Sequence, residues 1–182
     1  RAAVSLLDPS RRTHDVWLYD VARGLRTRFT FDPADEMMPI WSPDGRWVVF
    51  NSNRKGLRDL YQKASGGAGP EEVLLEGSFD KYAYSWPPDG RYLLYNSTVE
   101  NPRTGTDMWV LPLFGDRKPF PLLQTPFHEG LGHFSPDGRW IAYQSTESGR
   151  SEVYVAPFPG PGGKWQISTA GGSWARWRRD GR

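Results

Sequence analysis

The sequence has no cysteine, only three histidines and almost no excess of charge of either sign. Without cysteine the chain has no disulfide, no thiolate nucleophile and no cysteine-ligated zinc. Its 23 Lys and Arg are scattered against 21 Asp and Glu, for a formal net charge of +2, which argues against a nucleic-acid surface. No apolar stretch approaches the roughly 20 residues of a membrane span, and the first residues lack the apolar run of a signal peptide. We therefore expect no membrane insertion.

Long amphipathic patterns are also missing, because Pro or Gly interrupts nearly every window in which a helical period could be tried. The chain instead has 20 Gly, 16 Pro, 9 Trp, 8 Tyr and 9 Phe. This combination of turn formers with residues that suit pleated, half-buried surfaces predicts an all-β protein.

One turn motif, an aromatic residue followed three positions later by Asp-Gly, recurs at intervals of roughly 45 residues. Its four copies are Trp41 to Gly45, Trp86 to Gly90, Phe134 to Gly138 and Trp177 to Gly181. In the first three copies Pro presets the first turn angle, and in all four Asp can bond back to the backbone while Gly adopts a positive φ. The motif therefore predicts a tight connection between two strands in each copy.

Each of the first three turns is followed by an apolar run such as Val48 to Phe50, then by an acid before an apolar-aromatic pair, and then by a fourth short segment. The acids are Asp59, Asp107 and Glu152, and Asp15 stands in the same context near the start of the chain. Four short antiparallel strands per repeat indicate a β-propeller with four-stranded blades. A β-sandwich does not require the same turn in every period.

The Ser-Pro-Asp-Gly-Arg turn at 42–46 and 135–139, the apolar strand after it and the later acid-apolar-aromatic triplet resemble the TolB-like, WD-repeat-like β-propeller repeats of bacteria. The resemblance covers the whole chain, and it implies a bacterial protein without distinguishing periplasm from cytoplasm. The family's repeats occur in periplasmic TolB, in sensor regions and in peptidase gating domains. The fourth turn departs from the pattern, since Arg178 and Arg179 replace Ser-Pro.

The first residues align with the second strand of a blade, so we expect one blade to be split between the two ends of a single domain, 1–182. The approximate repeats are 1–41 plus 174–182, 42–86, 87–134 and 135–177. Four blades can close within one chain, or two chains can form an eight-bladed ring with two-fold symmetry. A fragment of a longer protein is a third possibility. Because large aromatic residues need room to pack, we favour the homodimer.

No catalytic, metal-binding or cofactor motif is present. The Gly171 to Ala175 segment matches a serine-hydrolase elbow only superficially. His128 and His133 with Glu129 have no zinc-site spacing, and we interpret His14 as a surface loop residue. The recurrence of Asp59, Asp107 and Glu152 at one position of the repeat favours a structural role. We therefore predict no catalytic residue, no metal and no cofactor.

The connections between blades are the best candidates for binding, because loops on a rigid scaffold vary while the strands repeat. These loops are 32–38, 77–81, 125–130 and 170–174. The predicted contact residues are Asp35, Glu36, Asp80, Lys81, Phe127, His128, Glu129 and Trp174. We expect a non-enzymatic scaffold that binds a protein or peptide, as a sensor or assembly module. Alternatives are a hydrolase or lyase that uses these histidines and carboxylates, and a repeat fragment or engineered propeller without a ligand.

Overall fold

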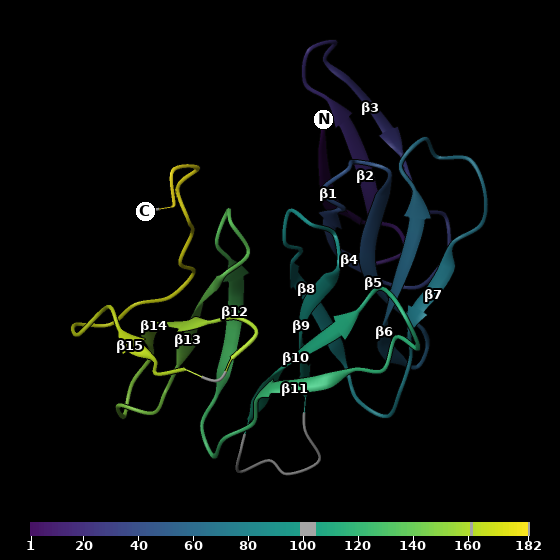
Figure 1. The fold of residues 1–182 in the computed structure, drawn as a ribbon. Helices are drawn as coiled ribbons and strands as arrows, with labels where there is room; N and C mark the ends of the chain where they lie inside the picture. Colours follow the sequence, from purple (N-terminus) through teal and green to yellow (C-terminus); the bar gives the residue numbers. More distant parts are fainter. Residues whose placement is uncertain (99–104, 161, 182) are drawn as a thin grey trace. The chain divides into compact units, whose positions relative to one another are not determined.

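The computed structural model of the chain describes residues 1–98, 105–160 and 162–181, and the predicted repeats 87–134, 135–177 and 174–182 each include residues outside this set. Within these ranges the chain is built of fifteen strands and no helix (Figure 1). No described segment is therefore a helix able to cross a membrane. The prediction of an all-β chain is confirmed.

The strands form four antiparallel sheets, and in each sheet the strands follow one another in chain order. The first sheet has three strands, β1 (Ala2–Asp8), β2 (Thr13–Asp20) and β3 (Leu25–Arg28). The second contains β4 (Glu36–Trp41), β5 (Trp47–Lys55), β6 (Leu57–Ala64) and β7 (Glu72–Leu75). The third contains β8 (Lys81–Ser85), β9 (Tyr92–Thr98), β10 (Thr106–Pro112) and β11 (Phe120–Leu123). The fourth contains β12 (Glu129–Phe134), β13 (Trp140–Ser145), β14 (Glu152–Pro157) and β15 (Trp165–Gln166).

The chain divides into two compact units, residues 1–83 and 84–182, with the boundary inside β8. In the first unit the core includes Val16, Val48, Phe50 and Tyr61. In the second it includes Leu94, Met108, Ile141 and Tyr143, among others. The apolar runs predicted after the Asp-Gly turns are thus the buried second strands of their sheets.

The recurrent turn has the chemistry that its sequence predicts. Ser135 Oγ donates to Asp137 Oδ1 at 2.5 Å and accepts the Trp140 amide at 3.0 Å, while the Gly138 amide donates to the Ser135 carbonyl at 2.9 Å. Gly138 has a φ of 71°, a region that favours glycine. Ser42 and Asp44 make the same bonds in the second sheet. These contacts close each turn and align the first strand with the second.

A second recurrent feature is a backbone irregularity two residues into the first strand of a sheet. The pairing register shifts between Met37 and Ile40 in β4, and at the equivalent place in β12. Met38 and Leu131 both have a φ of 55° there. Trp174 occupies the same position of the repeat and has a φ of 57°, although no strand is assigned to residues 174–177. The split blade stays a prediction, but the segment predicted to complete it has the same bend, at Trp174.

Neighbouring sheets are linked by an amide side chain at one position of the repeat. Asn51 Nδ2 in β5 donates to the carbonyl oxygen of Lys81 at 3.4 Å, and Asn96 Nδ2 in β9 donates to the carbonyl oxygen of Glu129 at 2.7 Å. A Cβ at Gly130 would lie 2.5 Å from Asn96 Nδ2, so glycine allows this approach. Gln144 stands at the equivalent place in β13 and instead donates to Ser151 Oγ at 2.8 Å.

The turn contacts lead to a first prediction. Replacing Ser135 by Ala removes both bonds of its hydroxyl and leaves the Trp140 amide without its acceptor, so the free energy of unfolding should fall by about 1 to 2 kcal/mol. Urea denaturation measures this change. Ser148→Ala is the matched control, because Ser148 is exposed and its hydroxyl makes one long bond of 3.3 Å. Equal stability of the two variants would contradict the assigned role.

Candidate functional site

The predicted contact residues lie where the last strand of one sheet connects to the first strand of the next. Glu36, Lys81 and Glu129 are the first residues of β4, β8 and β12, and all three side chains are buried. The prediction that they contact a partner stays untested, but each has an internal environment that the sequence did not reveal. This one position of the repeat therefore has a different residue or a different set of contacts in each of the three sheets.

Glu36 belongs to a buried cluster of charges around Arg54. The Arg54 guanidinium contacts the carboxylates of Glu36 and Glu71, the latter at 2.6 Å, and Asp32 lies 3.7 Å from Arg54 Nε. The guanidinium also lies 4.2 Å from the centre of the Tyr61 ring. Burial raises the pKa of Glu36 to about 7, and the charges of Glu71 and Asp32 act in the same direction, against a Thr30 hydrogen bond and Arg54. The cluster therefore makes Glu36 easier to protonate than an exposed glutamate.

Lys81 pairs with Asp59, the recurrent acid of the preceding sheet. Its ammonium lies 2.9 Å from Asp59 Oδ1 and donates to the Phe79 carbonyl oxygen at 2.6 Å. The Gly77 amide also donates to Asp59 Oδ1, at 3.1 Å. Since Lys81 and Asp59 are 5% and 4% exposed, this pair is largely removed from solvent. It fastens β8 to β6.

Glu129 replaces this lysine in the next repeat, so two buried carboxyl groups meet where the preceding repeat has an ion pair. Burial raises the pKa of Glu129, and the charge of Asp107 adds to the rise, against a hydrogen bond from Thr125. Burial also raises the pKa of Asp107, against a bond from Gln124. Glu129 Oε2 and Asp107 Oδ1 have no hydrogen-bond partner within the described ranges. Both carboxyl groups at this junction are therefore easier to protonate than exposed ones.

Asp35 and Asp80 are joined through Arg58, a residue that the sequence reasoning missed. Arg58 Nη2 lies 2.5 Å from Asp35 Oδ2, and the Arg58 amide donates to Asp80 Oδ1 at 2.8 Å. The His14 amide donates to Asp35 Oδ1 at 2.8 Å, and His14 Nδ1 lies 2.8 Å from the same Oδ1 atom. Although partial burial opposes it, Arg58 and His14 hold the pKa of Asp35 below its usual range.

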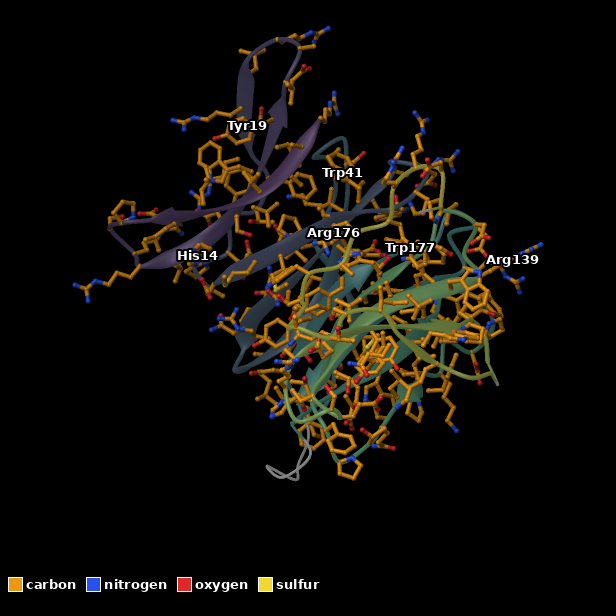
Figure 2. The ribbon with its side chains drawn as sticks, turned by 90° about the vertical axis from the view of Figure 1, so that its left-hand side faces the viewer. His14, Tyr19, Trp41, Arg139, Arg176 and Trp177 are labelled. Carbon is orange, nitrogen blue, oxygen red and sulfur yellow. The ribbon has the colours of Figure 1, made fainter. Side chains whose placement is uncertain are left out.

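His14 is a correction to the sequence reasoning. It lies within β2 and is half-buried rather than a surface loop residue (Figure 2). The strand begins at Thr13, two residues before the acid-apolar-aromatic triplet at Asp15 from which a strand was predicted, and it therefore includes His14.

The exposed members of the predicted set belong to the second unit. Phe127 is 39% exposed and Trp174 is 56% exposed, and the Arg176 guanidinium lies 5.7 Å from the centre of the Trp174 ring. His128 is also exposed, while its amide and carbonyl group are bonded to Thr146. These three side chains can contact a partner without breaking a buried interaction.

No group of three or more His, Asp or Glu side chains that could hold a metal occurs among the described residues. His133 lies in β12, and burial lowers its pKa to about 4. Its carbonyl oxygen accepts the indole N–H of Trp177 at 2.9 Å.

The recurrent acids have the structural role that their spacing predicts. Asp15 binds Arg11 and Arg28, each within 2.9 Å. Glu152 accepts the Gly171 amide at 2.9 Å and contacts Ser168 and Arg150. Asp59 holds Lys81, as described above. Each of these acids ties the strand that carries it to a neighbouring segment.

The raised pKa of Glu36 gives a second prediction. A carboxyl group that binds its proton more tightly in the folded chain stabilises fully below its unfolded pKa of 4.5, and this contribution is lost as the pH rises through about 7. Glu36→Gln imitates the protonated form, so it should reduce the loss of unfolding free energy between these pH values by on the order of 2 kcal/mol.

Urea denaturation at several pH values measures this effect, with Glu72→Gln as the control at an exposed glutamate. If Glu36→Gln destabilised the chain equally at every pH and kept the original pH dependence, Glu36 would be ionised by Arg54 throughout.

Comparisons with known proteins agree with the fold. No family model matches the chain. TolB from Acinetobacter baumannii is 18% identical, with a TM-score of 0.82 over 98% of this chain and 44% of that one. Putative TolB from Agrobacterium tumefaciens is 15% identical, with a TM-score of 0.58 over 93% of this chain and 72% of that one. An oligogalacturonate lyase solved with manganese is 14% identical, with a TM-score of 0.66 over 86% of this chain and 46% of that one.

A curated relative, an uncharacterized protein of Agrobacterium fabrum, is 34% identical over 59 residues, which is 32% of this chain and 20% of that protein. The chain thus spans one fifth of this relative and less than half of the Acinetobacter TolB. The four antiparallel sheets together with these likenesses confirm the resemblance stated from the turns: the chain has the TolB-like β-propeller fold.

Proposed function

We propose that the chain is a β-propeller binding scaffold whose loops between sheets bind a protein or peptide partner. The observation that carries the proposal is that each of these connections has one aromatic residue outside the buried core. Phe31 is 62% exposed, Phe127 is 39% exposed, Trp174 is 56% exposed, and Phe79 is half-buried. Aromatic side chains dominate the binding energy of protein interfaces because they bury much area at little entropic cost.

The chemistry around these aromatics supports a binding role. The carboxylates and cations at the same connections are occupied in Arg54, Lys81 and Arg58 contacts that hold the loops in place. A loop held in this way loses little conformational freedom when a partner binds. The exposed rings are therefore presented on a prearranged surface.

A selection from a phage-displayed library of random 12-residue peptides tests this proposal. Peptides enriched on the wild-type protein should bind Phe127→Ala or Trp174→Ala about tenfold more weakly, as measured by surface plasmon resonance. Phe114→Ala is the matched control, because Phe114 is a 43% exposed aromatic in the turn between β10 and β11. Equal loss in all three variants, or no loss in any, would contradict binding at these loops.

We also propose that two copies of the chain assemble into a closed ring. The first sheet has three strands where the others have four, and β1 is at its end. The backbone of Trp174 matches that of Met38 and Leu131 in complete first strands, which supports residues 172–177 as the strand that joins β1.

Light scattering on a sizing column should give about twice the chain mass of 20.7 kDa across a dilution series. Trp177→Pro removes a backbone N–H from the joining segment and should shift the mass toward 20.7 kDa, whereas Ser148→Pro in an exposed turn should not. A wild-type mass of one chain at every concentration would overturn the dimer.

A further inference from the structure

The outer strand of the first sheet differs in charge from its counterparts in the other three sheets. β3 is Leu25, Arg26, Thr27 and Arg28, so half of it is arginine. Its counterpart β7 begins with Glu72, β11 contains Pro121, and β15 has two residues. β3 is at the end of its sheet, and its outer backbone groups have no strand partner among the described residues. It is a short, basic edge.

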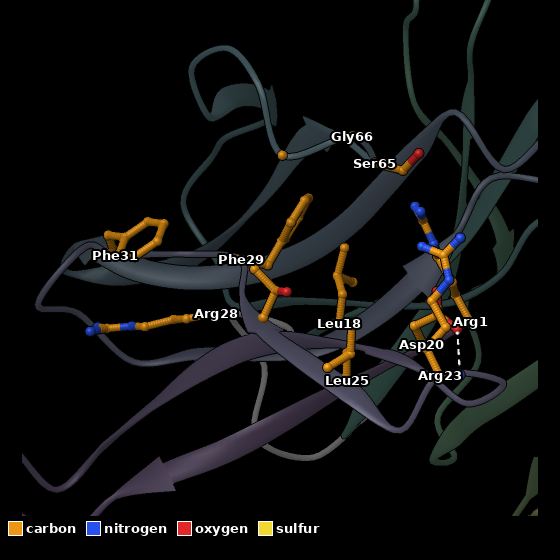
Figure 3. Close-up of a pocket in the computed structure, with 12 residues that line it drawn as sticks. Arg1, Leu18, Asp20, Arg23, Leu25, Arg28, Phe29, Phe31, Ser65 and Gly66 are labelled. Carbon is orange, nitrogen blue, oxygen red and sulfur yellow. Dashed lines mark hydrogen bonds and ion pairs between the residues drawn. The ribbon is translucent and has the colours of Figure 1, made fainter.

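A pocket of about 480 Å³ adjoins this edge, within the first unit. This volume is in the range of roughly 300 to 1,000 Å³ that is usual for ligand sites. The wall is made by one face of the first sheet and by the turn from Ser65 to Gly67. Figure 3 shows Leu18, Leu25 and Phe29 in the middle, with Arg1 and Arg23 toward one end and Arg28 and Phe31 toward the other.

The charge of the pocket is positive and only partly neutralised. Its lining contains three arginines and one carboxylate, Asp20. Arg23 reaches Asp20 only at 3.9 Å, and Arg1 has no ion pair with any described residue. Arg28 is bound to Asp15 at 2.8 Å and lies 5.2 Å from the centre of the Phe31 ring. Arg1 and Arg23 are therefore available to pair with an anion that enters the pocket.

Strand pairing defines which side chains a guest beside β3 would meet. Leu18 pairs with Thr27 and Asp20 with Leu25, and all four side chains line the pocket. Arg26 pairs with Tyr19 on the alternate position, and its guanidinium lies 5.5 Å from the centre of the Trp17 ring. Successive residues of an added strand would face the apolar pocket and the arginine-bearing side in turn.

We propose that the edge of β3 and the adjoining pocket bind an extended acidic peptide in which acidic and apolar residues alternate. The peptide adds a strand to β3, places an apolar side chain over Leu18, Leu25 and Phe29, and directs its carboxylates toward the arginines. Charged edges discourage pairing with neutral strands. The same arginines therefore select an acidic strand.

This site shares only Phe31 with the exposed aromatic residues of the proposed function. The turns after β2 and β6 that border the pocket lie at the ends of their strands opposite to the connections that precede β4 and β8, because consecutive strands are antiparallel. The tests of the two proposals substitute different residues, Phe127 and Trp174 for the loops and Arg23 and Arg26 for this site, so the two proposals can fail independently.

The probe is the labelled peptide fluorescein-Glu-Phe-Glu-Val-Glu-Phe-Glu-amide, titrated with the full chain and followed by fluorescence anisotropy. Arg23→Glu and Arg26→Glu should each weaken binding by about tenfold or more. Arg46→Glu is the matched control and should change binding by no more than about twofold, since its side chain is 81% exposed in the turn before β5.

Three further peptides separate strand addition from simple charge attraction. Serine in place of Phe and Val, lysine in place of Glu, and N-methylation of alternate backbone nitrogens should each weaken binding by about tenfold. Equal binding of the serine peptide, equal loss in Arg26→Glu and Arg46→Glu, or tolerance of N-methylation in both alternating patterns would overturn the proposal. So would loss of binding in Phe127→Ala, which would assign the peptide to the loops instead.

Discussion

In the third and fourth sheets, the residue that begins the first strand lies at the junction with the sheet before it. Lys81 pairs with Asp59 in a buried ion pair, while Glu129 replaces this lysine in the next repeat, where burial raises the pKa of both Glu129 and Asp107. The backbone carbonyl groups of Lys81 and Glu129 accept the same kind of hydrogen bond, from Asn51 and Asn96. The backbone link is thus the same at both junctions, and the side chain beside it differs in charge. Burying a carboxylate without a cation is costly, which is the physical cause of the raised pKa values.

Much of the fold follows from the sequence because its signals are local and repeated. The turn at Ser135 to Gly138 closes through its own side chains, and the run after it is a short continuous apolar segment of the kind that forms a buried strand. The acids at 59, 107 and 152 were assigned a structural role from recurrence alone, and their contacts agree. The turn contacts join residues no more than five positions apart, whereas the acids contact partners 17 to 22 positions away and were recognised by their recurrence.

The candidate site was less accessible to sequence reasoning because its contacts are distant in the chain. Arg58 joins Asp35 and Asp80 across 23 and 22 positions, and no local pattern relates them. Loop membership predicted exposure for Glu36, Lys81 and Glu129, but these residues begin strands and are buried. Phe127, His128 and Trp174 are exposed as a loop residue is expected to be. The basic strand β3 and its pocket had no sequence motif, since they arise from pairing and packing.

The positive φ of Trp174 has a further consequence for assembly. A large aromatic residue adopts this conformation at a cost in free energy, and the segment already has the bend without a paired strand. A bend at a fixed residue also determines register: in β4 and β12 the residues on either side of it pair with second-strand positions that are two apart. A strand that slipped by one position along β1 would place this bend opposite the wrong residue and turn its side chains to the other face. In the proposed assembly, the bend at Trp174 would therefore allow only one alignment of this segment with β1.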